Sequence, residues 1–508
     1  MRRGVRECAI VLALLGLTIA VRLAAFFHVV IDWDESLYAL VARAMLHGGW
    51  PYVAVWENKP PLLFLIFAAF FKAFGVGIVA VRLAADAAVA ASAYLLYRLG
   101  LRFAEGGPLV GMAAALLYLC ATTNDGGLAS NAEIFAAPLT CGGLLAATSS
   151  RRERAPMPLG RAALLGLWLG LSMQIKLTAV PEAVAIAAIA CLFWRIDWLG
   201  LLVIALLALV PFAAGSLTFG LAGHLAAYVD AVFLGDVRRL SEWSTGPTAA
   251  QTFVGQLGQL RALALFAPLA ALAAAFGGEP DERLRRLVAA ALVWWAADAL
   301  IVSATNEFEG HQFVTLMGPM ALLAAYGIFW LTQRLPRSGA SAIVVVAACC
   351  AVSAGPSVAS AAALVWHRTV MGDPQWGDPE AQFACVLGAR MKGDRSLFVM
   401  HQQPVLYLLT GSMLPTRYGY PPFLETRYFE RIAGIDGAAE ARRILATRPH
   451  FIATSIYVFD VGSRTVQAYN ARLYPAYRLV YTRDGNVIYQ LRPPARTRAA
   501  PRHVPNRR

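Results

Sequence analysis

Long apolar runs alternate with short polar connections through most of the chain. A helix of about 20 apolar residues is long enough to cross the hydrocarbon core of a bilayer. The first such run, over 8–30, is predicted to be an uncleaved span. Further runs near this length lie at about 78–98, 108–123, 132–149, 162–177, 178–194, 197–219, 254–277, 286–303, 312–333 and 340–366. The pattern predicts an α-helical polytopic membrane protein with about 11 transmembrane helices.

The basic residues predict how these helices are oriented, because short cytoplasmic loops are enriched in Lys and Arg. The arginines at the N-terminus and in alternate connections fall on one side, and they are Arg2, Arg3, Arg6, Arg98, Arg102, Arg151, Arg152, Arg154, Arg161, Arg195, Arg283, Arg285, Arg286, Arg334 and Arg337. We therefore expect the N-terminus to lie inside the cytoplasm. The extracytoplasmic face then receives five segments, namely 31–77, 124–131, 228–251, 306–311 and everything after Trp366.

The pattern changes after Trp366, where short strand and helix signals alternate. Strands are predicted at 397–400, 451–454, 479–481 and 487–491, helices at 379–391 and 438–446, and a hairpin turn at Asp484-Gly485. The chain therefore divides into a transmembrane domain over 1–366 and an extracytoplasmic α/β domain over 367–492, followed by a disordered basic tail over 493–508. The first extracytoplasmic loop, 31–77, carries interfacial helices, including an apolar stretch over 62–74 that is too short to cross.

Composition supports this class of protein. Of the 508 residues, 58% are hydrophobic and 15% are charged, which is too apolar for an ordinary soluble protein. The net charge of +13 would suggest a nucleic-acid partner in a soluble chain. Here the arginines are explained by membrane topology, so we expect no nucleic acid. The seven cysteines show neither a disulfide framework nor a metal-thiolate spacing.

The first outer loop contains the densest group of polar residues, because Asp32, Asp34, Glu35 and Tyr38 come directly after the first span. A structural explanation is available for one carboxylate, since an acidic residue often caps a short helix, which Gly48 would end here. That explanation does not account for three acidic residues together with a Lys-Pro-Pro sequence on the same loop. The loop is therefore the first candidate for a functional site.

Further ionisable and polar residues map to the same membrane face, and they are Asn131, Glu133, Lys176, Asp236, Arg238, Arg239, Glu307, Glu309 and His311. Ionisable groups at membrane depth are costly and usually face a cavity or one another. Their gathering on one face predicts a site there. Arg82 and Asp86, spaced i,i+4 on the second span, are instead expected to pair with each other.

Lysine usage adds a second signal, because four of the 44 basic residues are lysines, namely Lys59, Lys72, Lys176 and Lys392. Lys59 and Lys176 both fall at the predicted outer face. A compact ammonium binds phosphate as a point charge, so these two residues are candidate phosphate ligands. The alternative is that both are chance survivors of a bias towards arginine.

An ordered set of residues in the first outer loop resembles that of the bacterial protein O-mannosyltransferase-like and aminoarabinose lipid A transferase-like glycosyltransferases. The set is Asp34-Glu35, Tyr38, Met45, Gly48, Trp50, Lys59-Pro60-Pro61-Leu62, Phe74-Gly75 and Arg82. Similar segments recur at Asn131 and Glu133, at 166–176, and at 310–313 with Pro319, where Gln312 departs from the family's tyrosine. The resemblance implies the C-type glycosyltransferase fold and a bacterial cytoplasmic (inner) membrane protein.

The resemblance further implies transfer of a single sugar from a polyprenyl-phosphate-linked donor to an extracytoplasmic lipid, polysaccharide or protein, usually with inversion, which makes 1–366 the catalytic domain. Asp34 is the expected base, with Glu35 beside it. The expected ligands of the donor phosphate are Lys59, Lys176, Arg238, Arg239 and His311, and those of the sugar or a metal are Asp32, Tyr38, Glu57, Asn131 and Glu133. These oxygen ligands suit Mg or Mn, but no spacing requires a divalent cation.

Two hypotheses from other classes compete with a glycosyltransferase. A transporter or flippase of a lipid-linked sugar should have polar residues near the bilayer midplane and an internal repeat. Here the polar residues gather at one surface, and the sequence shows no repeat of fixed period. An envelope scaffold anchored by its spans would leave the carboxylates at the membrane face unexplained.

Overall fold

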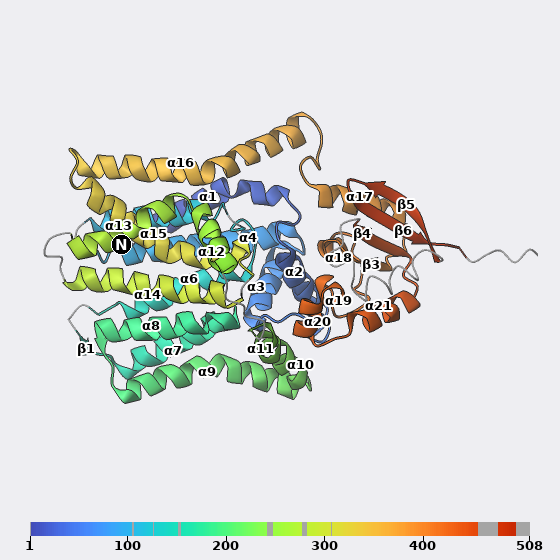
Figure 1. Ribbon diagram of the computed structural model, residues 1–508, viewed down its shortest axis with the longest axis horizontal. Coiled ribbons are helices and arrows are strands. Elements are labelled where there is room, and N and C mark those ends of the chain that lie inside the picture. Colours follow the sequence, from blue (N-terminus) through green and yellow to red (C-terminus); the bar gives the residue numbers. More distant parts are fainter. Residues whose placement is uncertain are drawn as a thin grey trace, which may run out of the picture.

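The computed structural model describes residues 2–103, 106–124, 126–150, 154–240, 247–276, 282–305, 307–455 and 476–493. The predicted basic tail lies outside the described residues from position 494 onward, and so do Arg151, Arg152 and Asn306 of the predicted connections. Two bodies are visible in Figure 1, a bundle of long helices and a smaller unit at one end of it that contains the four-stranded sheet.

The bundle consists of helices whose positions match the predicted apolar runs. They are α1 (Arg2–Val21), α4 (Ile78–Gly100), α5 (Gly107–Ala121), α6 (Ala132–Ala147), α7 (Leu159–Met173), α8 (Val180–Phe193), α9 (Trp198–Leu221), α12 (Pro247–Gln259), α13 (Ala262–Phe276), α14 (Glu282–Thr305), α15 (Val314–Thr332) and α16 (Ser338–Val365). Within the described residues, six helices are long and apolar enough to cross a membrane, and α12 with α13 forms a pair bent by 98°. The polytopic helical class is confirmed.

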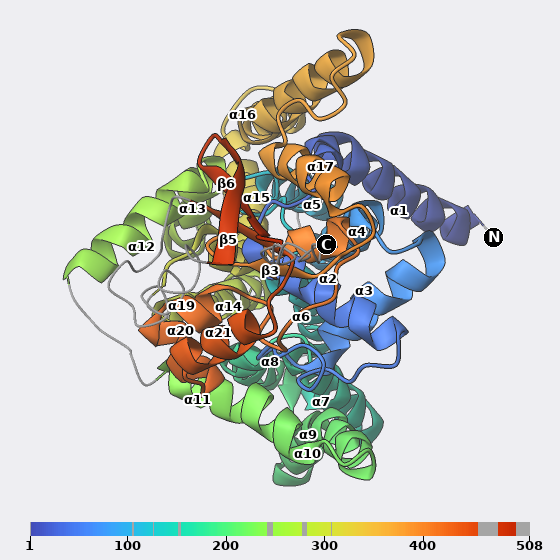
Figure 2. The same ribbon diagram turned by 90° about the vertical axis from the view of Figure 1, so that its right-hand side faces the viewer.

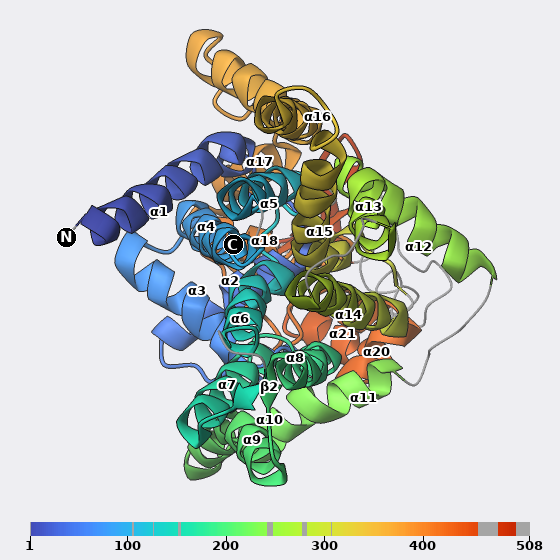
Figure 3. The same ribbon diagram turned by 90° about the vertical axis from the view of Figure 1, so that its left-hand side faces the viewer.

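The helices differ in how much of their surface is covered. Of the candidate span that ends in α15, 78% is buried, compared with 11% of α9 and 17% of α1. In the view along the bundle in Figure 3, α4, α5, α6, α14 and α15 lie inside, and α1, α9 and α16 lie at the periphery. The outer helices therefore leave apolar faces for lipid, because a bilayer solvates apolar side chains that water would not.

Small residues allow two helix pairs to approach closely. A Cβ at Gly100 of α4 would lie 2.3 Å from the Cα of Gly111 in α5. On α7, a Cβ at Gly166 would lie 2.3 Å from the Ile204 carbonyl oxygen, and one at Gly170 would lie 2.4 Å from a carbonyl oxygen of the same neighbour, α9. The Gly-x-x-x-Gly spacing thus serves helix packing.

Short helices cover the end of the bundle that faces the smaller unit, as Figure 1 shows. They are α2 (Trp33–Leu46), α3 (Pro61–Phe74), α10 (Leu225–Val229), the π-helical η3 (Asp230–Leu234) and α11 (Gly235–Leu240), with the 3-10 segments η1 (Leu23–Phe27), η2 (Leu177–Ala179) and η4 (Gly310–Phe313) nearby. The apolar α3 corresponds to the predicted interfacial helix, and its Lys72 is exposed. This end of the bundle carries the predicted site.

The smaller unit follows the π-helical segment η5 (Trp366–Val370). Its helices are α17 (Pro379–Met391), α18 (Val405–Leu409), α19 (Pro422–Glu425), α20 (Arg427–Ala433) and α21 (Gly437–Ala446), and its strands are β3 (Leu397–Val399), β4 (Phe451–Ser455), β5 (Tyr477–Arg483) and β6 (Asn486–Leu491). The sheet order is β3-β4-β6-β5, with β3 and β4 parallel and the other pairs antiparallel. Figure 2 shows this unit in front of the bundle. Elsewhere, β1 (Ala155–Pro156) and β2 (Trp194–Arg195) form one short parallel pair.

The predicted hairpin turn is present, because Asp484 and Gly485 both have positive φ, at 51° and 81°. Two such residues between antiparallel strands form the turn that matches the twist of a hairpin.

Backbone and side-chain contacts dock the smaller unit onto the first outer loop. The amide of Trp56 donates to the Arg417 carbonyl oxygen at 2.8 Å, and the Trp56 ring meets Phe423 edge-on with centroids 4.8 Å apart. Arg43 of α2 donates to the carbonyl oxygens of Tyr407 and Ser412, each at 2.8 Å. The first outer loop and the α/β unit are therefore docked against each other.

Candidate functional site

A buried ion pair fixes the start of α2. Nη2 of Arg82 donates to Oε1 of Glu35 at 2.7 Å, and Nη1 donates to the other carboxylate oxygen. The same carboxylate accepts from the amides of Ile31, at 2.6 Å, and Ser130, at 2.7 Å. The side chain of Glu35 thus joins α2, α4 and the 124–131 connection. It does not line the cavity described below.

The predicted pairing of Arg82 with Asp86 is wrong. Asp86 instead accepts from Nε of Arg22 at 2.7 Å, and Arg22 also donates to the carbonyl oxygens of Thr122 and Gly127. An i,i+4 pair is worth only a few tenths of a kcal/mol on a helix surface. A planar guanidinium gains more from two parallel bonds to one carboxylate, which Glu35 offers Arg82 from outside the helix.

Asp32 acts both as a helix cap and as part of the site. It is the N-cap of α2 and accepts from the Asp34 amide at 3.0 Å within a capping box completed by Glu35. Its other oxygen lies 3.1 Å from Nδ1 of His311, and Asn131 is buried beside it. Burial alone would raise the pKa of Asp32, but the hydrogen bond and charge of His311 outweigh burial and lower it. Asp32 therefore caps α2 with one carboxylate oxygen and contacts His311 of the site with the other.

Asp34 has the opposite electrostatic environment. Burial, followed by the adjacent Asp32 carboxylate, raises the pKa of Asp34 above its usual range. The Tyr38 hydroxyl donates to Oδ2 of Asp34 at 3.1 Å, and the Tyr38 ring packs against Phe64 and Phe67. A carboxylate with a raised pKa that is held in place by a packed tyrosine is suited to accept a proton.

Lys59 lies between acidic side chains that are themselves buried. Its Nζ is 3.2 Å from Oδ1 of Asn58 and 3.6 Å from Oε1 of Glu57, while Asn58 donates to Asp236 of α11 at 2.6 Å. Burial raises the pKa of Glu57 to about 7 despite the opposing charge of Lys59. The pKa of Lys59 is also raised, because Glu57 and Asp34 outweigh the effect of burial. The lysine is therefore a fixed positive charge at neutral pH.

Arg239 is held by a carboxylate from a distant part of the chain. Its guanidinium forms two hydrogen bonds with Glu307, the one from Nε measuring 3.1 Å. Glu307 also accepts from the Tyr428 hydroxyl at 2.6 Å and from Nε2 of Gln312 at 2.9 Å. Glu307 thus joins α11, the segment before α15 and the α/β unit.

These groups surround a cavity of about 520 Å³ between the bundle and the α/β unit, which we call the polar cavity. The residues that line it are Asp32, Trp33, Asp34, Glu57, Asn58, Lys59, Arg239, Glu307, Glu309, His311, Tyr420, Pro422, Phe423, Thr426, Tyr428, Phe429 and Ile432. Six predicted site residues are therefore brought together here, namely Asp32, Asp34, Glu57, Lys59, Arg239 and His311. The aromatic residues of α19, α20 and the segment before them also line the cavity, and the clustering of Tyr and Phe over 418–429 was the one sequence signal for them.

The other predicted site residues lie outside the lining. Nζ of Lys176 is 2.5 Å from Oε1 of Glu133 at the start of α6, and both are buried. Arg238 forms an ion pair with Asp230 on the same stretch of helix. Together with Glu35, Tyr38 and Asn131, these residues surround the site without forming its surface.

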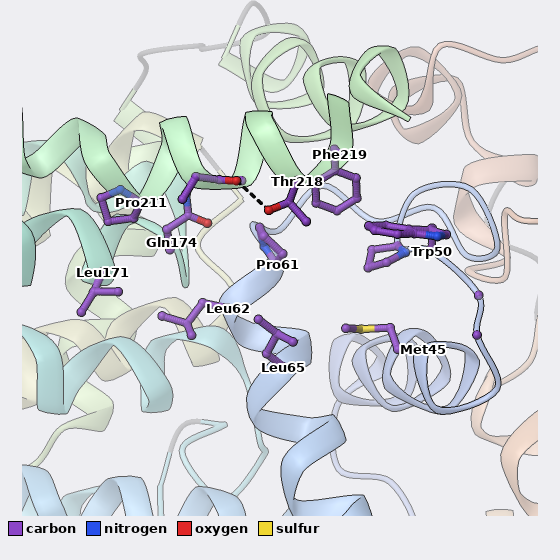
Figure 4. A pocket seen from close by; sticks show the side chains of 15 residues that line it. Met45, Trp50, Pro61, Leu62, Leu65, Leu171, Gln174, Pro211, Thr218 and Phe219 are labelled. Atoms are coloured by element: carbon purple, nitrogen blue, oxygen red, sulfur yellow. Dashed lines mark hydrogen bonds between the residues drawn. The ribbon is translucent and has the colours of Figure 1, made fainter. Parts of the chain in front are cut away.

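A second cavity of about 580 Å³ adjoins the first outer loop (Figure 4) and is mostly apolar. It is lined by Met45, Gly48, Gly49, Trp50, Pro51, Pro61, Leu62, Leu65, Leu171, Gln174, Pro211, Ala214, Gly215, Thr218 and Phe219. We call it the apolar groove. Lys59 lines the polar cavity, and Pro61, two residues later, lines the groove. One short segment of chain therefore contributes to the lining of both cavities.

Neither the sequence spacing nor the described part of the structure requires a divalent cation. Among the described residues, no three His, Cys, Asp or Glu side chains are grouped so that they could hold a metal ion. Asp32 is occupied by His311 and the helix cap, and Glu57 by Lys59.

Comparisons with known proteins give the fold. Residues 58–215 match the family model described as dolichyl-phosphate-mannose-protein mannosyltransferase. The structure is similar to the crystal structure of ArnT from Cupriavidus metallidurans bound to undecaprenyl phosphate, with a TM-score of 0.58 and 16% identity over 96% of this chain and 97% of that one. The chain has the C-type glycosyltransferase fold.

A second similarity agrees with this C-type fold. The archaeal oligosaccharyltransferase AglB from Archaeoglobus fulgidus, in complex with an inhibitory peptide and a dolichol-phosphate, gives a TM-score of 0.50 and 10% identity over 96% of this chain and 74% of that one. None of the curated proteins matches this sequence. The C-type fold inferred from the first outer loop is therefore confirmed, while Asp34 and the α/β unit lie outside the segment matched by the family model.

Proposed function

We propose that the protein is a membrane glycosyltransferase that moves a single sugar from a polyprenyl-phosphate-linked donor to an extracytoplasmic acceptor, with inversion at the anomeric carbon. The observation that carries this proposal is the pair of cavities, because Lys59 lines the polar cavity and Pro61, two residues later, lines the apolar groove. A polyprenyl-phosphate sugar has the same sequence of parts, an apolar tail, a phosphate and a polar ring.

The cavities orient the donor. Its tail lies in the apolar groove, where Leu62, Leu65 and Phe219 offer contacts that need no polar partner. Its phosphate lies at Lys59, with Arg239 and His311 as further cationic ligands. The similar structures support a polyprenyl phosphate as the ligand, since ArnT was crystallised with undecaprenyl phosphate bound and AglB in complex with a dolichol-phosphate.

The residues then suit a single displacement. The acceptor hydroxyl transfers its proton to the Asp34 carboxylate, and its oxygen forms a bond with the anomeric carbon as the bond from that carbon to the phosphate oxygen breaks. The electron pair of the broken bond stays on the phosphate, where Lys59 and Arg239 stabilise the added charge. Attack on the face opposite the phosphate inverts the anomeric carbon.

The remaining predicted residues support this centre. Tyr38 positions Asp34 through its hydrogen bond, and Glu35 positions α2 through Arg82. Glu57 accepts hydrogen bonds from the hydroxyls of the donor sugar. Glu133, held by Lys176, adds a buried negative charge on the side of the site that carries His311.

We further propose that the site opens to the outside of a bacterial cytoplasmic membrane. The five segments placed outside by the arginine pattern meet at one end of the bundle, through contacts such as His311–Asp32, Arg239–Glu307 and Trp56–Arg417. A periplasm-dependent reporter fused after Trp366 tests this orientation. An active reporter is expected, and activity restricted to the cytoplasm would reverse the topology.

The direct experiment is a transfer assay with purified protein and radiolabelled polyprenyl-phosphate mannose, glucose, galactose or arabinose. Transfer by the wild type that is lost in Asp34→Asn, at equal expression, supports the proposal. Movement of labelled lipid across vesicles without any transfer would instead identify a transporter or flippase.

A further inference from the structure

The polar cavity has two chemically different walls. The bundle and its loops contribute every charged residue, including Asp34, Lys59 and Arg239. The α/β unit contributes the segment 420–432, whose lining side chains are aromatic, apolar or, at Thr426, neutral and polar. We call this second surface the aromatic wall. The donor phosphate binds the cationic side chains of the first wall. The proposed sugar transfer assigns no role to the aromatic wall.

The rings of the aromatic wall form a continuous surface that begins beside the proposed base. Tyr420 meets Trp33, the neighbour of Asp34 in sequence, with ring centroids 5.8 Å apart. Phe429 follows at 5.6 Å from Tyr420, and Tyr428 at 5.0 Å from Phe429. All four rings line the cavity and are only partly buried. A molecule that approaches Asp34 along this side passes over them.

The polar ends of the wall point into the charged part of the site. The Tyr428 hydroxyl donates to Glu307. The Tyr420 hydroxyl forms no hydrogen bond within the described part of the chain, although burial and several cavity carboxylates, with Asp34 first among them, raise its pKa. It therefore remains a neutral donor in position for a ligand oxygen.

This combination matches a neutral sugar ring. The carbon-bound hydrogens of a sugar pack on aromatic faces, and its hydroxyls bond with carboxylates and with a tyrosine hydroxyl. The cavity holds five carboxylates against three cationic side chains, and all three, Lys59, Arg239 and His311, are assigned to the donor phosphate. An anionic acceptor would meet repulsion from the remaining carboxylates.

An extended peptide fits the wall less well. Peptides are commonly bound by addition to an exposed sheet edge. None of the residues from β3, β4, β5 or β6 lines the cavity, and the wall is formed by α19, α20 and the segment before them. Within the described residues, the main chain of the sheet is therefore not offered to an acceptor here.

We propose that the aromatic wall is the acceptor subsite, and that the acceptor is a neutral sugar unit of a glycan or glycolipid whose hydroxyl reaches Asp34 across Tyr420. This inference rests on the proposed glycosyl transfer and specifies its acceptor. It also gives the α/β unit a defined task, since that unit supplies the wall while the bundle supplies the chemistry.

The test uses the full-length protein in lipid nanodiscs with the donors named above. Three acceptor classes are compared, namely neutral methyl or nitrophenyl glycosides, a sugar phosphate, and a peptide rich in Ser and Thr. Tyr420→Leu and Phe429→Leu remove ring faces from the wall. Tyr481→Leu is the matched control, because Tyr481 packs against Phe383 in the same unit and does not line the cavity.

We expect transfer to the neutral glycosides. We also expect Tyr420→Leu and Phe429→Leu to raise the KM for the acceptor about tenfold without changing the KM for the donor, because loss of a stacked ring removes contact with one substrate only. Tyr481→Leu should change neither constant. Tyr420→Phe keeps the ring, so it gives a second readout should the larger change impair folding, and it should raise the acceptor KM by less than Tyr420→Leu does.

The outcomes separate this inference from the proposed function. Transfer only to the peptide or only to the sugar phosphate overturns the neutral-sugar acceptor and leaves glycosyl transfer standing. A rise in the donor KM with an unchanged acceptor KM would assign the aromatic wall to the donor and also overturn the inference. Absence of both transfer and donor hydrolysis in the wild type would overturn the proposed function and this inference with it.

Discussion

Nη2 of Arg82 lies 2.7 Å from Oε1 of Glu35, and both side chains are almost fully buried where α2 meets α4. The pair fixes the helix that carries Asp34, the residue immediately before Glu35. A buried charge that loses its partner is left uncompensated, which is far more costly than loss of a pair at the surface. The position of the proposed base therefore depends on an arginine that lines no part of the cavity.

This relationship predicts the effect of Arg82→Met on stability. We expect a loss of about 3–5 kcal/mol in the free energy of unfolding, because Glu35 remains buried without its cation. Combining Arg82→Met with Glu35→Gln should recover much of the loss, since the charge itself is then removed. Arg443→Met breaks the exposed pair with Glu440 and should cost less than about 1 kcal/mol. Unfolding in detergent measures the free energy of unfolding of all three variants. Equal losses for Arg82→Met and Arg443→Met would contradict the prediction.

Replacement of the proposed base should affect the chemical step. Asp34→Asn keeps the shape of the side chain and is expected to lower kcat by about 10²–10⁴-fold, the usual contribution of a general base. Binding of polyprenyl phosphate should persist, because the carboxylate does not contact the tail. Because the pKa of Asp34 is raised, wild-type activity should increase with pH through a titration above the ordinary carboxyl range. Full activity of Asp34→Asn would show that the base lies elsewhere.

One buried and one exposed lysine, close together in the chain, give a matched pair for testing the phosphate contact. Lys59→Ala should lower kcat by about 10²–10³-fold, as expected when one stabilising contact to the developing charge is lost. Lys72→Ala changes an exposed lysine of α3 and should leave activity unaltered. Transfer assays at equal expression measure both. A similar loss in both variants would indicate a general effect of charge at the membrane surface.

Glu57 predicts a dependence of stability on pH. Its pKa is raised from 4.5 to about 7 by burial, so the folded protein holds a proton that the unfolded chain has already lost between these values. Stability should therefore fall as pH rises through this window, by up to about 3 kcal/mol. Glu57→Gln removes the titrating group and should flatten the profile. Melting temperatures between pH 4.5 and 8 provide the measurement, and parallel profiles for both proteins would refute the assignment.

The apolar groove predicts selectivity for the lipid tail. Ala214 of α9 lines the groove, so Ala214→Phe should fill part of it and weaken the binding of a long-chain polyprenyl phosphate. Inhibition by inorganic phosphate, which has no tail, should be unchanged. Leu206→Phe, at an exposed position of the same helix outside the groove, is the control. Equal weakening by the two substitutions would place the tail elsewhere.

Much of the architecture could be predicted from the sequence, because it depends on local periodicity and on the bilayer. The apolar runs predicted the helices, and the alternation of arginines grouped the five segments that meet at the site. The sequence Asp484-Gly485 predicted the hairpin turn, because these two residues tolerate the positive φ angles that the turn requires. A cap formed by one acidic residue of the first outer loop could be predicted, because a capping interaction such as that of Asp32 is confined to neighbouring residues.

The pairing of charges and the second wall of the cavity depended on tertiary structure. Sequence spacing suggested Asp86 for Arg82, whereas the folded chain offers it Glu35, 47 positions away, with better geometry. Tyr428 likewise reaches Glu307 across 121 positions. Such contacts follow from how whole elements pack, and no local pattern encodes them. The sequence by itself therefore determined which polar groups face one end of the bundle, and the tertiary structure decided which of them line a common cavity.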